Sequence, residues 1–153
     1  EPPARVGMRT MGEEAQETDR PRASIYAVFE TDTELENNGV VFDCGFGKFR
    51  VAYVGNPDFV RELAAAMKPY SEANARGLLD DGFTRKILID VYARTIVRGW
   101  EGVVGRDGQP LPYSTEACVK LMSDLPRLFS MVREWAANFA NYRRSYVESV
   151  TGN

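Results

Sequence analysis

An apolar seam near the C-terminus places the strongest constraint on the fold of this chain. Seven apolar side chains recur at spacings of 3, 4, 3, 4, 3 and 4, namely Leu125, Leu128, Val132, Trp135, Phe139, Tyr142 and Tyr146. A 3.5-residue repeat of this kind is typical of a helix that buries one stripe of its surface. The seam therefore predicts one continuous, long amphipathic helix over residues 125–147.

This seam has two interpretations. It is either a core face that packs against the rest of the same chain, or a face that meets another chain, and both can hold at different points along one helix. Trp and Tyr are favoured where a surface is apolar on one side and wet on the other. The second interpretation gives the candidate partner-binding residues, which are Leu128, Val132, Trp135, Phe139, Tyr142 and Tyr146.

Local signals predict the other elements. Strands are expected over residues 24–30, 40–44 and 48–54, the last two joined by a turn at Gly45-Phe46-Gly47. Helices are expected as a turn over 32–38 closed by Gly39, and over 56–68, 83–98 and 114–123. The fold class is therefore α+β and mainly α, a small antiparallel β meander near the N-terminus followed by four helices, the last long and amphipathic.

Composition divides the chain into an arm and one domain. Residues 1–23 are polar and rich in proline, which predicts a flexible N-terminal arm. Residues 24–150 are expected to form a single domain, with a β meander plus helix at 24–70, a polar linker at 71–82 and a helical part at 83–150. Residues 1–23 lack the apolar core of a signal peptide, and no apolar run approaches the ~20 residues that span a bilayer. No membrane partner is expected.

The absence of histidine restricts the chemistry. None of the 153 residues is histidine, which excludes Ser/His and Cys/His nucleophile pairs, imidazole bases and every metal site that needs imidazole. Cys44 and Cys118 form no CxxC pair, which argues against a zinc or iron–sulfur site. They either form one disulfide or, as we expect in a reducing cytosol, remain two free thiols. An enzyme is not expected, although a small hydrolase that uses carboxylates is a remote alternative.

Several weaker patterns have ordinary structural interpretations and indicate no binding site. Glycines 102, 105 and 108 lack the order of a phosphate-binding loop and predict a surface turn, and Trp100 is expected to be a core anchor. The acidic residues Asp32, Glu34, Glu36 and Asp43, like the pair Asp80-Asp81, are expected to be solvated rather than to hold a cation. The net charge of −3 and the lack of a dense Lys/Arg stripe argue against nucleic acid. No metal and no cofactor are expected.

Three stretches, taken in order, resemble a known family. The first contains Gly47-Lys48-Phe49-Arg50-Val51-Ala52, Gly55-Asn56-Pro57-Asp58-Phe59 and Met67-Lys68-Pro69-Tyr70. The second contains Ile89-Asp90-Val91-Tyr92-Ala93 and Trp100-Glu101-Gly102-Val103. The third contains Asp107-Gly108-Gln109-Pro110-Leu111-Pro112-Tyr113-Ser114, Leu125-Pro126-Arg127-Leu128-Phe129 and Ala137-Asn138-Phe139. Over residues 30–143 the chain resembles the tail assembly chaperones of long-tailed bacteriophages.

The resemblance implies a function without catalysis. Such chaperones bind the tape measure protein, keep its long apolar helices soluble and help to recruit tail tube subunits in the host bacterial cytoplasm. Self-association is expected because weak repeated contacts along a long client gain from multivalency. The strands expected in residues 24–54 depart from the helical character of that family. They favour the alternative of a structural tail protein, either a tail-completion or a tube component of the virion.

Overall fold

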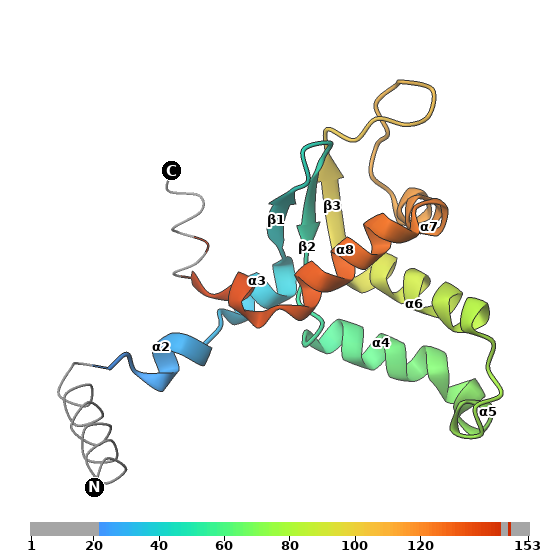
Figure 1. Cartoon of the computed structure of the whole chain (residues 1–153), viewed down its shortest axis with the longest axis horizontal. Coiled ribbons are helices and arrows are strands. Elements are labelled where there is room, and N and C mark those ends of the chain that lie inside the picture. The colour runs from blue at the N-terminus through green and yellow to red at the C-terminus, as the bar shows by residue number, and fades with distance from the viewer. Residues whose placement is uncertain (1–21, 145–146, 148–153) are drawn as a thin grey trace, which may run out of the picture. The chain divides into compact units, whose positions relative to one another are not determined.

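The computed structural model describes residues 22–144 and 147 (Figure 1). The chain divides into two units, Glu1–Glu30 and Thr31–Asn153, which are considered separately. In the described part of the first unit, helix α2 (Ile25–Phe29) begins where the Ser24 hydroxyl accepts a hydrogen bond from the Tyr26 amide at 3.2 Å. The predicted strand over 24–30 is therefore wrong. The serine cap favours a helical turn here, over the strand propensity of the side chains that follow it.

The second unit contains a three-stranded antiparallel sheet in the order β1-β2-β3. The predicted hairpin is confirmed as β1 (Val40–Asp43) and β2 (Lys48–Val51). The other edge of β2 pairs with β3 (Val97–Glu101), a segment that the sequence assigns to a helix end and a loop. The chain thus has a three-stranded antiparallel sheet, but its third strand is contributed by residues 97–101, after the intervening helices, and not by 24–30. Phe49 lies opposite Phe42 on one side and Trp100 on the other, which makes one face of the sheet apolar.

The predicted helices before residue 125 are confirmed, with small shifts at their ends. They are α3 (Thr33–Asn38), α4 (Pro57–Met67), α6 (Asp81–Thr95) and α7 (Thr115–Asp124). Side-chain caps set their starts: the Asn56 oxygen accepts from the Phe59 amide and the Ser114 hydroxyl from the Ala117 amide, both at 3.0 Å. The predicted linker over 71–82 is partly helical, because a turn of 3-10 helix, η1 (Lys68–Tyr70), leads into α5 (Ser71–Ala75).

The predicted long helix over 125–147 is wrong, because it breaks at Asn138. Helix α8 (Pro126–Ala137) ends there, and a 3-10 turn, η2 (Phe139–Tyr142), follows. The Asn138 side chain accepts from the Ala140 amide at 3.1 Å, and the Asn141 side chain donates to the Trp135 carbonyl at 3.1 Å. Asparagine side chains that satisfy nearby backbone groups compete in this way with helix continuation. The break turns Tyr142 beneath β2, where its hydroxyl donates to the Val51 carbonyl at 3.0 Å.

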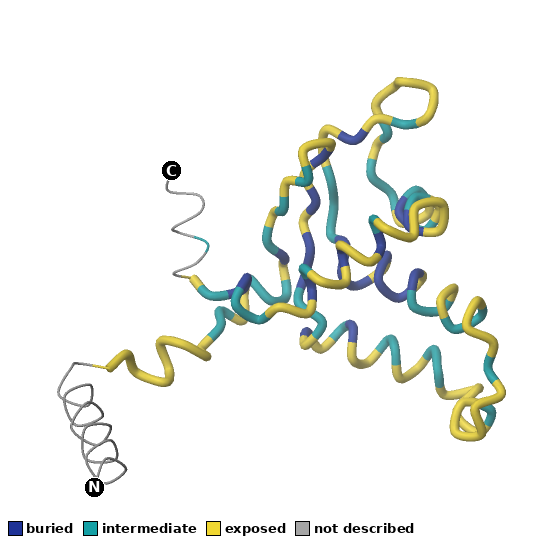
Figure 2. The backbone as a smooth tube through the Cα atoms, viewed as in Figure 1, coloured by how far each residue is buried: buried dark blue, intermediate teal, exposed yellow. Residues whose placement is uncertain are grey.

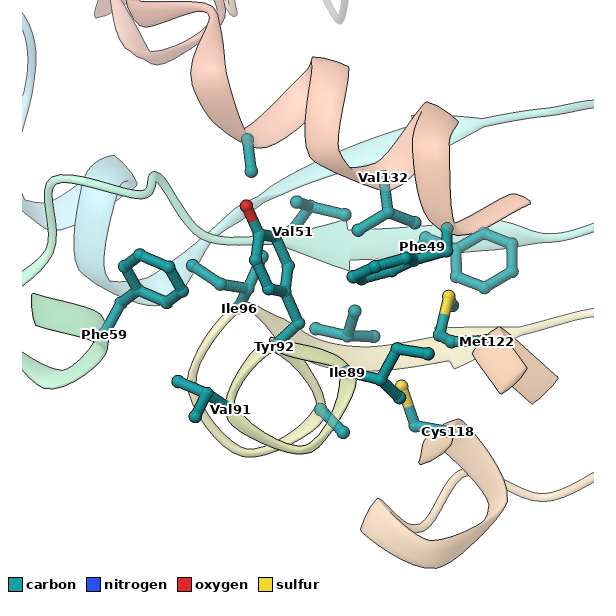
Figure 3. Close-up of a cluster of buried hydrophobic side chains, with 14 of the residues drawn as sticks. Phe49, Val51, Phe59, Ile89, Val91, Tyr92, Ile96, Cys118, Met122 and Val132 are labelled. Atoms are coloured by element: carbon teal, nitrogen blue, oxygen red, sulfur yellow. The ribbon is translucent and has the colours of Figure 1, made fainter. Parts of the chain in front are cut away.

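The core lies between the apolar face of the sheet and helices α6, α7 and α8 (Figures 2 and 3). Its most deeply buried side chains include Phe49, Val51, Ile96, Cys118, Met122, Phe129 and Val132. Both cysteines are free, and burial raises the pKa of the Cys118 thiol to about 12. Trp100 packs against this core and donates from its indole nitrogen to the Leu111 carbonyl at 2.8 Å. None of the helices that the structure describes has the length and apolar content that a membrane crossing requires.

Candidate protein-binding groove

The structure places the candidate partner-binding residues mainly against the chain's own core. Val132 and Tyr142 are fully buried, and Leu128, Trp135 and Phe139 are half-buried, whereas Tyr146 lies outside the described residues. The ring of Trp135 stacks on Phe42 with their centroids 4.9 Å apart. The burial of Val132 and Tyr142 favours the core-face interpretation of the seam. Because α8 ends at Asn138, Phe139 and Tyr142 do not continue its stripe.

An open groove lies along another side of α8. A hollow of about 560 Å³ between α4, α6 and α8 is lined by Val54, Phe59, Leu88, Tyr92, Ser130, Arg133, Glu134 and Ala137. A second hollow of about 360 Å³ continues between α6 and α8 and shares Leu88, Ser130 and Arg133 with the first. We call the two together the α4–α6–α8 groove. Figure 1 shows the three helices that border it.

Three aromatic rings, one from each helix, hold the floor of this groove. The ring of Tyr92 on α6 lies 5.1 Å from that of Phe59 on α4 and 5.3 Å from that of Phe129 on α8, both edge to face. In Figure 3, Tyr92 rises from α6 toward α8 with Phe59 beside it. Edge-to-face pairs of this kind are favourable beyond their buried area. The floor is therefore apolar and fixed in position by packing, which is what a preformed binding groove requires.

One ion pair joins α4 and α6 outside the residues that line the groove. Arg94 of α6 pairs with Glu62 of α4 and, at 3.0 Å, with Asp90 on its own helix. Inside the groove, burial raises the pKa of the Tyr92 hydroxyl, and the nearby Arg133 guanidinium opposes that rise. The hydroxyl is thus neutral at physiological pH and offers a hydrogen-bond donor on an otherwise apolar floor.

Two of the acidic residues that the sequence singles out, Asp32 and Asp80, cap helices. Asp32 caps α3 by accepting from the Glu34 amide at 2.9 Å, and it pairs with Arg144 at 2.6 Å. The hydrogen bond from Arg144 is the main cause that lowers the pKa of Asp32. Asp80 caps α6 by accepting from the amides of residues 82 and 83. Within the described residues, no group of three or more metal-ligating side chains is positioned to hold an ion.

The glycine-punctuated segment after β3 forms a turn at the surface. The Gly105 amide donates to the Gln109 carbonyl at 2.9 Å, and Gly102 and Gly108 adopt positive φ angles of 75° and 77°. Glycine tolerates such angles without strain, which explains its use at these two positions. The surface-turn interpretation of these glycines is confirmed.

The sequence did not point to the groove. Three of its polar lining residues, Ser130, Arg133 and Glu134, lie on α8 between the positions of the apolar seam, and the others lie on α6. Its apolar lining residues are contributed by Val54 in the loop before α4 and by three helices that are far apart in the chain. The available signal was the Asn56-Pro57 start of α4, which fixes where Phe59 stands, but this signal says nothing about the neighbours of that ring.

Comparison with known proteins adds one finding. A family model described as "YdaY prophage protein" matches residues 54–153, which is more than half of the chain. The matched region begins just before α4 and includes every residue that lines the α4–α6–α8 groove, while β1 and β2 precede it. No curated protein and no solved structure matches the chain.

Proposed function

The chain belongs to the YdaY prophage protein family and is therefore phage-derived, and from this premise we propose that it is a tail assembly chaperone. It binds the tape measure protein and keeps that protein soluble until the tail tube is built around it. The α4–α6–α8 groove is the observation that carries the proposal. A client whose long helices are apolar needs a partner that covers one helical face, and an apolar groove is the usual means of doing so.

The dimensions and make-up of the groove support a helical client. The hollow of about 560 Å³ shares three lining residues with a second one between α6 and α8, so the two form one open surface rather than a closed pocket. Its lining includes the aromatic rings of Phe59, Tyr92 and Phe129, and aromatic side chains contribute strongly to the energetics of protein interfaces. We therefore place the client helix along α8, over Tyr92 and Leu88.

In this proposal the protein acts by binding alone, without catalysis, in the cytoplasm of the host bacterium. Several copies act along one client, and self-association raises the local concentration of grooves. The same assembly helps to recruit tail tube subunits.

Co-expression with the cognate tape measure protein tests this function. We expect the tape measure protein to be soluble when the chaperone is present and insoluble when it is absent, as measured by fractionating the cell lysate. A tape measure protein that stays insoluble at a molar excess of folded chaperone contradicts the proposal. The control is an unrelated phage protein of similar size and charge.

Composition of the finished particle separates this function from that of a structural tail protein, the alternative that the small β-sheet favours. A chaperone leaves before the tail is complete, so we expect mass spectrometry of purified virions to detect tube and tape measure proteins without this chain. Stoichiometric amounts of the chain in virions would favour the structural alternative.

A further inference from the structure

Two arginines from different helices stand over the same ring in the groove. The guanidinium carbon of Arg85 on α6 lies 5.8 Å from the centre of the Phe129 ring, and that of Arg133 on α8 lies 5.5 Å from it. Both arginines are exposed and line the hollow between α6 and α8. The Arg133 guanidinium also hydrogen-bonds to the Tyr92 hydroxyl, so its remaining N–H groups and those of Arg85 are the ones that can bind a carboxylate.

These two arginines differ from others around the same helices. Arg94 pairs with Glu62 and Asp90, and Arg61 and Arg98 both pair with Asp58. Neither Arg85 nor Arg133 forms an ion pair with a carboxylate in the described part of the chain. The groove thus holds two positive groups whose charge is not matched by an ion pair, beside an apolar floor.

We infer that the α4–α6–α8 groove is specific for an acidic amphipathic helix, with Arg85 and Arg133 binding carboxylates at the border of its apolar face. The inference rests on the proposed function and names the chemistry of the client segment. Leu88 and Tyr92 contact the apolar face, and the two guanidinium groups contact glutamate or aspartate side chains one helical turn apart. Glu134 and Asp81 also border the groove, and they disfavour a client helix that is acidic all round.

The charge distribution of the chain argues for a protein client at this site rather than a nucleic acid. The net charge is −3, and binding to a phosphate backbone requires a longer row of cations than two arginines beside two carboxylates. An apolar floor between the cations also has no role in binding a phosphate backbone. An amphipathic helix uses both features.

Charge reversal in the full-length protein tests the inference. The probes are the cognate tape measure protein and three synthetic amphipathic helices with the same leucine face, flanked by glutamate, glutamine or lysine. Affinities are measured by isothermal titration for the wild type, for Arg85→Glu with Arg133→Glu, and for Arg127→Glu as the matched control. Arg127 is an exposed arginine of α8 that lines neither hollow. If the reversed pair does not fold, as judged by its melting temperature, Arg85→Gln with Arg133→Gln replaces it.

The expected result is an order of affinities. The wild type binds the glutamate helix more tightly than the glutamine helix and the lysine helix least, with a loss of about tenfold for each contact to a charged group. The reversed pair prefers the lysine helix, an exchange that a merely structural role for the arginines does not produce. Arg127→Glu leaves the order unchanged.

The outcomes separate the two proposals. Equal affinity of the wild type for the three helices, or an unchanged order in the reversed pair, overturns the inference about charge while leaving chaperone function intact. If the wild type binds the glutamate helix selectively but not the tape measure protein, the inference about charge holds and the proposed function fails.

Discussion

The two sides of α8 differ in how completely they are covered. Toward the sheet, Val132 and Ala136 are fully buried, Trp135 stacks on Phe42, and the Ala136 carbonyl accepts from the Val54 amide at 3.0 Å. Toward α4, Ser130 and Arg133 border an open groove. One helix thus supplies both core and candidate binding surface. Substitutions on its two sides are expected to separate into effects on stability and effects on binding.

Trp135→Ala is expected to have the largest effect on stability. It removes the stack with Phe42 and the contact with Phe49, which together hold α8 on the sheet. Loss of a large aromatic side chain packed in a core costs about 3 kcal/mol or more of unfolding free energy. Urea denaturation followed by circular dichroism measures this change. The neighbouring exposed Glu134→Ala should stay within about 0.5 kcal/mol of the wild type.

The opposite result for Trp135→Ala would mean that the side of α8 toward the sheet is a binding surface rather than core. Unchanged stability together with loss of self-association in sedimentation experiments would make Trp135 an interface residue. Phe139→Ala in η2 offers the same comparison beyond the helix break.

Tyr142→Phe is expected to cost about 1–2 kcal/mol, because it leaves the buried Val51 carbonyl without its hydroxyl partner. Thermal and urea unfolding measure the loss. Tyr26→Phe, at a position 71% exposed in the first unit, is the control and should have no measurable effect. Equal stability of Tyr142→Phe and the wild type would show that the hydrogen bond beneath β2 contributes nothing to the fold.

Alkaline pH should weaken the packed core, which contains the buried side chains of Tyr142 and Cys118. Burial raises the pKa of Tyr142 above the ordinary 10.0 and that of Cys118 from 9.0 to about 12. The unfolded chain therefore loses these protons at lower pH than the folded chain does, so the stability present below pH 9 declines as pH rises. The free energy of unfolding then falls by up to about 1.4 kcal/mol per pH unit for each group. Urea unfolding at a series of pH values from about 8 upward checks this, and the stability of Tyr142→Phe should decline less steeply than that of the wild type.

Asn138→Ala tests the break that ends α8 and is expected to have the smallest of these effects. The variant loses the cap on the Ala140 amide and should be destabilised by about 1 kcal/mol. Its matched control is Asn74→Ala, an exposed asparagine within α5 that should tolerate the change. A more stable Asn138→Ala with higher helical content would mean that the seam favours a continuous helix after all.

Signals within a few residues predicted much of the fold. Asn56-Pro57, Ser114 and the glycines around Phe46 each set a helix start or a turn through contacts with near neighbours, and the structure confirms all three. The break at Asn138 is also caused by local contacts. The apolar spacing does not reveal it, because Asn138 lies between two seam positions and leaves their spacing unchanged. Periodicity reports which residues face inward and says less about where the backbone bends.

Pairing between distant segments could not be predicted. Residues 24–30 are rich in β-branched and aromatic residues, whereas residues 97–101 contain only one of each, yet only the second segment pairs with β2, where Trp100 lies opposite Phe49. Tertiary contacts override local propensity in such cases. The groove is unpredictable for the same reason, since Phe59, Tyr92 and Phe129 meet only after three helices have packed.

Blocking the groove tests the central claim most directly. Ser130 is exposed and lines both hollows, so Ser130→Trp fills the groove without disturbing the core. Its control is Met131→Trp on the same helix, at a position 41% exposed that lines neither hollow. With melting temperatures equal to that of the wild type, Ser130→Trp should bind the tape measure protein at least about tenfold more weakly, as expected for a blocked contact centre. Met131→Trp should bind it as the wild type does. Equal affinity of both variants and the wild type would contradict the groove as the client site.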